Sequence, residues 1–412
     1  MHIAVIIPTP AFEGGVVRNT LNMLRMLALG ARKHGDPLTL SFGYPEEMNT
    51  GRWRLEELED EGIQVRPYQR QSIPADALAP YYEVMLDTRH QAKVPSYAVF
   101  NDGISNFEDA DLWLFISDHL SEMPPPHKPY GVVVYDFVNR YYPNIWGEPN
   151  WQAGESRALL VQHADFVITT TRQTKQDVVT YVGYPASKVH VQPIEFDPLE
   201  ELAPSTNRAT LKQIVWPTIM SQHENHEAVL AGLEAFLRRN RSFRVIVLGP
   251  HTQQMDSRKP VTNDHPYIHR LRAIVAKSTE LSSRLEFPGY VDDHKYQHIL
   301  KSSAVLLHTS RCDNGSYTVI EAAWMNTPAV SARYAAMEEV AEQFELPLVF
   351  FDYNIKNDLV NRLEDAIARR DELKQLLPDH HSLGTHSYRE LASRYWEQFK
   401  GVATDVIGAE TE

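Results

Sequence analysis

The chain has 412 residues, more than one ordinary hydrophobic core serves, and its 43% hydrophobic content is that of a globular protein, so we expect two domains. The formal net charge of −14 argues against nucleic acid or an anionic membrane surface as the main partner. The single cysteine, Cys312, excludes an internal disulfide and suits a reducing compartment.

The start of the chain lacks the basic region of a signal peptide and turns polar too early for one. No apolar run in the sequence approaches the ~20 residues that a membrane-spanning helix requires. We therefore expect a cytoplasmic protein, at most peripheral to the inner face of the membrane.

The chain opens with the pattern of a dinucleotide-type fold. Residues 2–7 form an unbroken apolar strand, residues 8–15 a loop that ends in Gly14 and Gly15, and residues 16–33 a long helix. Strand, glycine-bearing loop and helix in this order begin a Rossmann-like unit. A pair of glycines alone is equally compatible with a plain turn.

Strands and helices then alternate, which predicts a mostly parallel, doubly wound sheet. Helices are expected between several strands, for example over residues 156–164 and 173–182. The strand candidates are residues 38–42, 64–68, 98–101, 112–116, 130–135, 166–169 and 188–194.

Residues 195–208, after the last of these strands, are acidic, contain proline and have no periodicity, which is typical of a linker. We place the first domain at residues 1–195, the linker at 196–208 and a second Rossmann-like domain at 209–385. In the second domain we expect strands at 213–217, 243–248, 285–290 and 348–351, and helices at 225–239, 293–302 and 357–376. An amphipathic helix over residues 387–407 ends the chain.

Residues 303–331 are the stretch around which the rest of the chain is organised. A buried strand at 304–308 leads into a loop of small residues at 309–316, a helix at 317–325 and a short strand at 328–331. The free backbone N–H groups at the start of that helix, together with its dipole, favour an anion such as phosphate. Glu321 lies one turn into the helix, where its carboxylate can accept hydrogen bonds from a hydroxyl-rich ligand.

This stretch resembles the motif S-x-x-E-G-F-G-x-x-x-x-E-A-x-x-x-G-x-P-V-V of retaining glycosyltransferases of family 4. The two acidic positions keep their spacing as Asp313 and Glu321, but the first is Asp instead of Glu, and Asn314 and Ser316 replace two glycines. The resemblance implies the GT-B fold, an α/β architecture of two Rossmann-like doubly wound domains that face each other across a cleft. It also implies that the C-terminal helix, residues 386–412, packs back toward the first domain.

The resemblance also implies roles for individual residues. Asp313 would contact the hydroxyls of the donor sugar, and Glu321 would hold the ribose. In the first domain, Gly14 and Gly15 match a glycine pair that faces the cleft. Asp136 matches the acidic residue of a His-Asp pair that ends a strand, with Tyr135 at the histidine position. The residues expected to meet the phosphate are Asn314, Gly315, Ser316, Tyr317 and Thr318.

The diphosphate clamp departs from the family pattern. The family carries an Arg and, five residues later, a Lys after the first strand of the second domain, and the matching positions here are Ile219 and Glu224. A carboxylate near a diphosphate is repulsive, so another cation must substitute or the reaction is altered. Arg311 is the best candidate because it lies two residues before Asp313 and its planar fork suits phosphate. The other candidates are Arg258, Lys259 and Arg333.

Two histidines in the same segment have the spacing of metal ligands on a helix, His223 and His226. No third ligand of matching context appears, so we interpret them as part of a helix-capping segment.

The sequence therefore predicts a retaining glycosyltransferase that moves a hexose from a UDP- or GDP-sugar to a glycan, a lipid-linked or another hydroxyl acceptor, with no required metal. The predicted catalytic set is Asp313, Glu321, Asp136 and Arg311. Two alternatives stay open: a catalytically altered GT-B protein that acts as a scaffold or regulatory subunit, and another GT-B chemistry such as sugar epimerisation. The donor base, the sugar, the acceptor and the oligomeric state are not specified by the sequence.

Overall fold

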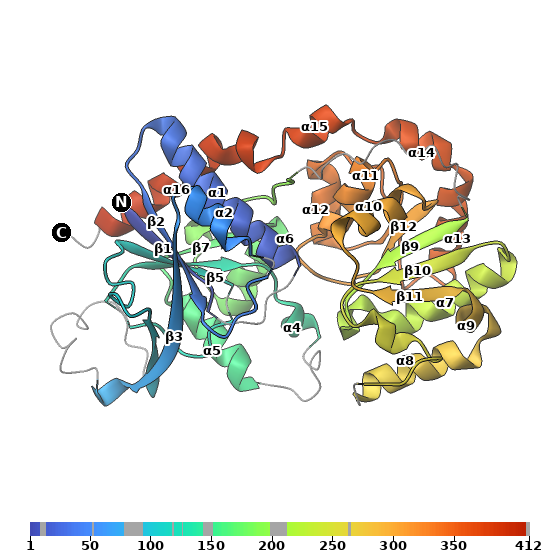
Figure 1. Cartoon of the computed structure of the whole chain (residues 1–412), viewed down its shortest axis with the longest axis horizontal. Helices are drawn as coiled ribbons and strands as arrows, with labels where there is room; N and C mark the ends of the chain where they lie inside the picture. Colours follow the sequence, from blue (N-terminus) through green and yellow to red (C-terminus); the bar gives the residue numbers. More distant parts are fainter. Residues whose placement is uncertain are drawn as a thin grey trace. The chain divides into compact units, whose positions relative to one another are not determined.

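The computed structural model describes residues 1–8, 14–51, 53–77, 94–117, 119–125, 127–142, 151–197, 212–262 and 265–408 (Figure 1). The chain divides into two compact units. The first unit comprises Met1–Phe137, Glu148–Asp197 and Thr385–Glu412, and the second comprises Val138–Gly147 and Pro198–Gly384. The predicted linker at 196–208 lies mostly outside the described residues, but Phe196 is fully buried in the first unit.

The first unit is built on a sheet of eight described strands in the order β4-β3-β2-β1-β5-β6-β7-β8. All neighbouring strands pair in parallel except β3 and β4, which are antiparallel. The strands are β1 His2–Ile6, β2 Thr39–Pro45, β3 Gln64–Pro74, β4 Ser96–Asn101, β5 Leu112–Ile116, β6 Tyr130–Val134, β7 Phe166–Thr169 and β8 Val189–Val191.

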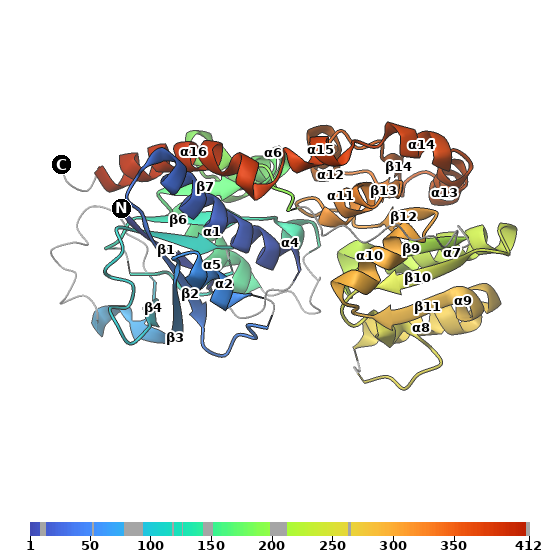
Figure 2. The same ribbon diagram turned by 45° about the horizontal axis from the view of Figure 1, so that its top comes forward.

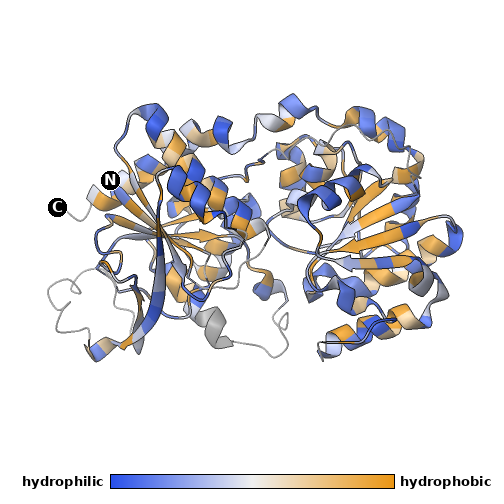
Figure 3. Cartoon of the chain, in the orientation of Figure 1, coloured by the Kyte–Doolittle hydropathy of each residue, from blue (hydrophilic) through white to orange (hydrophobic). Residues whose placement is uncertain are grey.

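Its helices cover the sheet on both sides, and the apolar strands lie between them, as the colouring in Figure 3 shows. Helix α6 continues into a π-helical turn, Val178–Val182, where we expected one regular helix over 173–182. The helices of this unit are α1 Gly15–His34, α2 Leu55–Asp60, α5 Trp151–Gln162, α6 Arg172–Asp177 and α16 Tyr388–Gly408.

Helix α16 lies along α1, as Figures 1 and 2 both show. The two helices approach so closely at Gly30 that a Cβ there would collide with the backbone of Ala392 and the side chain of Trp396. The indole Nε1 of Trp396 donates to Asp36 Oδ2 at 2.7 Å, and Lys400 Nζ donates to Asp36 Oδ1 at 2.6 Å. The C-terminal segment is therefore part of the core of the first unit.

The second unit contains a six-stranded parallel sheet in the order β11-β10-β9-β12-β13-β14. Its strands are β9 Gln213–Pro217, β10 Arg244–Leu248, β11 Leu285–Gly289, β12 Val305–His308, β13 Ala329–Ala332 and β14 Val349–Phe351. Its described helices are α4 Val138–Tyr141, α7 His226–Arg239, α8 Pro266–Lys277, α9 Thr279–Arg284, α10 Asp293–Lys301, α11 Tyr317–Trp324, α12 Ala335–Gln343, α13 Asp358–Ala368, α14 Arg370–Leu376 and α15 His380–Gly384.

Two expected elements have different bounds in the structure. The helix expected over 357–376 is divided at Arg369, whose guanidinium bonds Asp365 at 3.2 Å on one side of the break and Glu372 at 2.8 Å on the other. Strand β3 extends six residues beyond the expected 64–68, because residues 69–74 pair antiparallel with β4. This extension is mostly exposed, so no apolar pattern marks it in the sequence.

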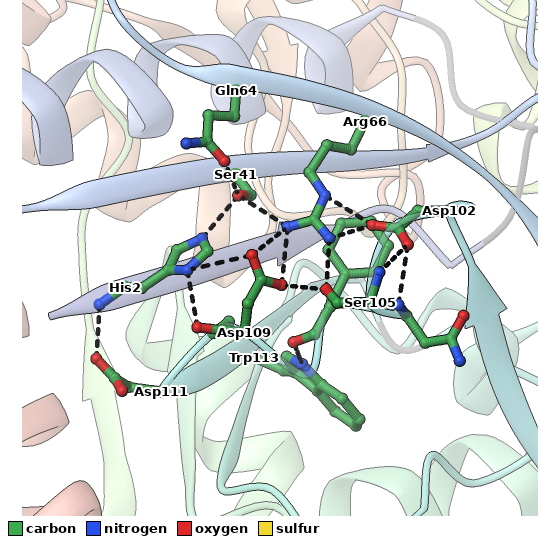
Figure 4. Close-up of polar contacts among 12 residues, drawn as sticks. His2, Ser41, Gln64, Arg66, Asp102, Ser105, Asp109, Asp111 and Trp113 are labelled. Carbon is green, nitrogen blue, oxygen red and sulfur yellow. Dashed lines mark hydrogen bonds and ion pairs between the residues drawn. The ribbon is translucent and has the colours of Figure 1, made fainter.

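A buried ion cluster lies at the amino-terminal edge of the first sheet (Figure 4). Arg66 of β3 donates from Nε to Asp102 Oδ2 at 2.7 Å, from Nη1 to Asp109 Oδ1 at 3.0 Å and from Nη2 to Ser105 Oγ at 2.9 Å. His2 joins the cluster through Ser41 Oγ, 2.7 Å from its Nε2. The cluster binds the 102–109 loop to the sheet.

Each sheet has one topological switch point, where the chain reverses the direction in which strands are added. It lies between β1 and β5 in the first unit and between β9 and β12 in the second. In open α/β sheets, ligands bind outside the carboxyl ends of the strands at this point. The loops that follow β9 and β12 are therefore the first place to look for a site.

Among the described helices, none combines the length and the apolar composition needed to cross a membrane.

Candidate functional site

The loops that follow β9 and β12 are bonded together at the switch point of the second unit. The Arg311 amide donates to the His223 carbonyl at 3.0 Å. Trp216 Nε1 donates to Thr309 Oγ1 at 2.9 Å, and Thr309 Oγ1 donates in turn to Glu224 Oε2 at 3.2 Å. Segments about 85 residues apart are thus joined by one buried polar network at the carboxyl ends of the two strands.

Asp313 is held in place by groups from three elements. Its Oδ1 accepts from the Gly315 amide at 2.7 Å and from the Tyr334 hydroxyl at 2.5 Å, and its Oδ2 lies 3.8 Å from His308 Nε2. His308 ends β12 and Tyr334 follows β13. Gly315 has a φ of 90°, and a Cβ there would collide with Val340, so only glycine fits this turn.

Helix α11 begins directly after this turn. Ser316 caps it, because its Oγ accepts from the Thr318 amide at 3.3 Å. The five residues predicted to meet a phosphate, 314–318, all lie half-buried at this end of the helix. Two of their amides, those of Gly315 and Thr318, already have partners inside the loop.

Glu321 lies one turn into α11 and is 4% exposed, so it is not a solvated helix residue. The hydroxyl of Tyr296, on α10, donates to its Oε2 at 2.8 Å. A buried carboxylate with an aimed donor is a positioned acceptor.

Arg311 is exposed in the same loop, with its guanidinium carbon 5.2 Å from the centre of the Tyr353 ring. The Tyr353 hydroxyl donates to the Thr309 carbonyl at 2.6 Å, which holds the ring against the loop. The other candidate cations have acidic neighbours: Arg333 bonds Glu338, while Arg258 lies 2.7 Å and Lys259 3.9 Å from the carboxylate of Asp256.

His226 is fully buried between Thr218 Oγ1 at 3.0 Å and the Tyr267 hydroxyl at 2.8 Å. Burial lowers the pKa of its imidazole to about 3, so the ring is neutral. Both ring nitrogens of His226 are engaged inside the fold. Among the described residues, no group of three His, Cys, Asp or Glu side chains is placed to hold a metal ion.

In the first unit, Gly14 adopts a φ of 70° and caps α1, and Gly15 is the first residue of the helix. The rest of that loop, residues 9–13, lies outside the described residues. Asp136 follows the carboxyl end of β6 and is half-buried.

Tyr135 points into the first unit, where its hydroxyl donates to Asn19 Oδ1 at 2.9 Å. Asn19 and Asn22, on one face of α1, donate in turn to Glu195 at 2.8 and 3.1 Å. Glu195 is 1% exposed and lines a small cavity together with Thr170 and Tyr395. Tyr135 is therefore an interior residue, and its hydroxyl has an internal partner where the family has a histidine.

Residues 204–378 match the sequence model of the family described as glycosyl transferases group 1. The matched residues lie within the second unit. A search of curated protein sequences found no match.

Solved structures match over nearly the whole chain. HepE of Anabaena in complex with UDP has a TM-score of 0.65 and 14% identity, over 98% of this chain and 100% of that one. A glycosyltransferase from Rickettsia africae ESF-5 has a TM-score of 0.61 and 14% identity, over 98% of both chains. Sucrose-phosphate synthase from Thermosynechococcus elongatus has a TM-score of 0.62 and 14% identity, over 98% of this chain and 99% of that one. The predicted fold class, GT-B with two Rossmann-like α/β domains, is confirmed.

Within the matched region, the two clamp positions, Ile219 and Glu224, differ in environment as well as in chemistry. Ile219 is 45% exposed, whereas Glu224 is buried. Burial, followed by the nearby negative charge of Asp313, raises the pKa of Glu224 to about 8. Glu224 is therefore mostly a neutral acid at pH 7, which corrects the reading of this position as an anion.

Sequence reasoning missed several partners of this site. His308 and Tyr334 stand at or just beyond the carboxyl ends of β12 and β13, a position that the doubly wound topology marks as functional. Thr309 follows His308 and carries the same signal. Tyr296 lies inside α10, and no local pattern distinguishes it.

Proposed function

We propose that this protein is a retaining glycosyltransferase that transfers a hexose from a nucleotide diphosphate sugar to a hydroxyl group of a glycan or lipid-linked acceptor. The observation that carries the proposal is the convergence of Asp313, the start of α11 and the buried carboxylate of Glu321 at the switch point of the region that matches glycosyl transferases group 1.

The transfer requires a held ribose, a stabilised leaving diphosphate and a positioned sugar. Glu321 accepts from the ribose hydroxyls, for which Tyr296 pre-orients its carboxylate. The first turn of α11 meets the diphosphate, because N–H groups and the helix dipole favour an anion there. Asp313, fixed by Gly315 and Tyr334, orients the sugar hydroxyls.

Arg311 stabilises the charge that develops on the leaving diphosphate. It is exposed in the loop that also carries Asp313, and its guanidinium lies near the Tyr353 ring, with no ion pair to an acid in the described part of the chain. In the first unit, Asp136 and the glycine pair Gly14 and Gly15 serve the donor sugar and the acceptor. The reaction needs no metal, and transfer is expected to continue in a chelator.

A uridine nucleotide is the first donor to test, because HepE was solved with UDP and with UDP-glucose. GDP-sugars are the competing class. The two donor classes share a nucleoside diphosphate and differ in the base.

The test is a thermal-shift panel of UDP, GDP and their hexose conjugates, followed by transfer assays with the donors that bind. A ligand at 100 times its dissociation constant adds about 2.7 kcal/mol of stability. The variants are Asp313→Asn and Arg311→Ala, with Asp371→Asn as the matched control because Asp371 is 92% exposed on α14. Removal of one preorganised charge-stabilising group costs about 10²-fold in turnover.

We expect both site variants to lose about that factor and the control to keep parental turnover. An Arg311→Ala protein that turns over at the parental rate would remove Arg311 from the site. If no nucleotide stabilises the protein, the proposal that it is a glycosyltransferase is overturned.

A second candidate is a scaffold or regulatory subunit with an altered donor site. It is favoured by one observation: the two clamp positions hold an exposed isoleucine and a buried glutamate instead of two cations. The same nucleotide panel separates the two candidates, because a scaffold of this kind gives no shift.

A further inference from the structure

Glu224 is a buried acid whose neighbours in the second unit include the hydroxyls of Thr218 and Thr309 and the ring of His223. It sits in the short turn Gln222–Glu224 after β9, and its side chain is 10% exposed. Trp216 Nε1 donates to Thr309 Oγ1, so the hydroxyl hydrogen of Thr309 is directed to Glu224 Oε2, 3.2 Å away. Oε2 is thus an acceptor, and the Oε1 atom faces His223 Nε2 at 3.8 Å.

Asp313 is a second acid near this point, and after burial its charge is the next cause that raises the pKa of Glu224. Asp313 accepts from the Gly315 amide and the Tyr334 hydroxyl at 2.7 and 2.5 Å. Glu224 accepts from the hydroxyls of Thr218 and Thr309. Hydrogen bonds to the charged form favour ionisation, and a like charge opposes it. For Glu224, burial and the nearby Asp313 carboxylate outweigh the two hydroxyl bonds and disfavour the charged form.

We propose that Glu224 gates the anion site of this domain: as a neutral acid it leaves room for the donor diphosphate beside α11, and as a carboxylate it repels it. The inference rests on the proposed nucleotide-sugar function and adds a positioning residue to it. A cation at the same position would attract diphosphate at every pH, whereas a buried acid makes the attraction conditional.

The groups that face Glu224 come from five elements. They are His223 in its own turn, Asp313 in the loop after β12, Tyr267 on α8, Tyr334 after β13 and Tyr353 after β14. Burial raises the pKa values of the three tyrosines, so none of them gains charge between pH 7 and pH 9.

The pH range over which UDP affinity should fall follows from the pKa of Glu224. Burial and Asp313 raise its pKa to about 8. Between pH 7 and pH 9 the neutral fraction of such a group falls from about nine-tenths to about one-tenth. We therefore expect the affinity for UDP to fall about tenfold over this range.

The experiment measures UDP affinity by calorimetry at pH 7 and pH 9 in the parent, in Glu224→Gln and in Glu227→Gln. Glutamine is nearly isosteric with the neutral acid and does not titrate. Glu227 is the matched control, since it lies three residues along the chain, is 49% exposed and pairs with Arg270 at 3.1 Å. Titration of the ligand affects all three proteins equally.

We expect the parent and Glu227→Gln to lose about tenfold and Glu224→Gln to lose less than about twofold. A loss in Glu224→Gln as steep as in the parent overturns the gate while leaving the proposed function intact. Binding that is absent from all three proteins at both pH values overturns the proposed function, and the gate with it.

A second variant covers the case in which Glu224→Gln fails to fold. Thr309→Val keeps the shape of the side chain and removes a hydroxyl that donates to Glu224 Oε2 at 3.2 Å. Loss of that hydrogen bond disfavours the carboxylate, so the midpoint of the affinity loss moves to higher pH. A midpoint that stays in place or moves lower contradicts the gate.

Discussion

At the scale of single residues, burial decides what each acidic side chain of the second unit does. Glu321, Glu224 and Asp313 lie in one region of the fold, but their partners differ. Asp313 accepts from a backbone amide and a tyrosine hydroxyl, whereas Glu224 is buried beside two threonine hydroxyls and has a raised pKa. The surroundings of each carboxyl group therefore decide what it does.

The buried position of Glu321 makes a sharp prediction about ribose binding. Glu321→Gln replaces an ionised acceptor with a neutral amide of nearly the same shape. A hydrogen bond to a charged group contributes roughly 1.5–3 kcal/mol, so UDP affinity is expected to fall about 10- to 150-fold. Calorimetry with UDP measures the loss.

The control for this variant is Glu286→Gln, on β11, where the carboxylate pairs with Arg244 at 2.9 Å and is half exposed. We expect it to bind UDP as the parent does. Equal affinity in Glu321→Gln and the parent would refute the ribose role of Glu321.

At the scale of elements, the two edges of the first sheet have different tasks. The carboxyl ends of the strands border the loop that carries Gly14 and the segment that carries Asp136. The amino ends hold the ion cluster around Arg66, whose guanidinium also lies 4.4 Å from the centre of the Phe107 ring. The cluster is a structural device because it ties a long loop to β3, away from the edge where ligands bind.

We expect a large loss of stability when the Arg66 side chain loses its guanidinium. Arg66→Met leaves Asp102 and Asp109 without their cation, and breaking a buried ion pair in this way costs about 3–5 kcal/mol. Arg70→Met is the control on the same strand, since Arg70 is exposed and makes only a 3.4 Å bond to Ser121. Denaturant unfolding of the first unit gives both values.

The same cluster makes the stability of the first unit depend on pH in the acid range. Although burial opposes ionisation, hydrogen bonds from the loop amides, from Ser105 and from Arg66 hold the pKa values of Asp102 and Asp109 below the usual range. A depressed folded-state pKa contributes stability above the unfolded value of about 3.9, and this contribution is lost as the pH falls through the folded value. Arg66→Met should lose less stability than the parent as the pH falls through this range. An equal loss of unfolding free energy in both proteins would contradict the assignment.

At the scale of the whole molecule, the first unit is assembled from both ends of the chain. Its core combines β1 and α1 with Tyr395, Trp396 and Phe399 of α16. The core of the second unit, centred on Trp216 and the strands around it, includes no residue after Leu373 among those described. The two units therefore differ in their dependence on the C-terminus.

Deletion of residues 385–412 tests this dependence. Loss of one buried large aromatic costs about 3–5 kcal/mol, and three such losses approach or exceed the 5–15 kcal/mol that stabilises a typical domain. We expect the first unit to unfold and the second to survive. Limited proteolysis and thermal unfolding report each unit separately.

Deletion of residues 409–412 is the control, because α16 ends at Gly408. This shorter chain should show both unfolding transitions of the parent. Two intact transitions in the longer deletion would show that α16 is dispensable for the first unit.

The sequence alone determined the order of strands and helices, the division into two Rossmann-like domains and the placement of Asp313 and Glu321 around the start of one helix. These follow from local signals, since apolar periodicity, glycine turns and helix caps act within about ten residues. The expected strands at 112–116 and 166–169 coincide with β5 and β7 for this reason. Strand β3 was underestimated because its extension is mostly exposed and exists only through pairing with β4.

Only the tertiary structure decided the protonation of Glu224, the partners of Asp313 and the interior position of Tyr135. The carboxyl of Glu224 meets Thr309 across 85 positions of the sequence, and the hydroxyl of Tyr135 meets Asn19 across 116. Burial and hydrogen bonding set a pKa, and both depend on groups that the fold brings together from distant segments. A glutamate in a sequence is therefore an anion by default, and the fold around Glu224 makes it mostly neutral at pH 7.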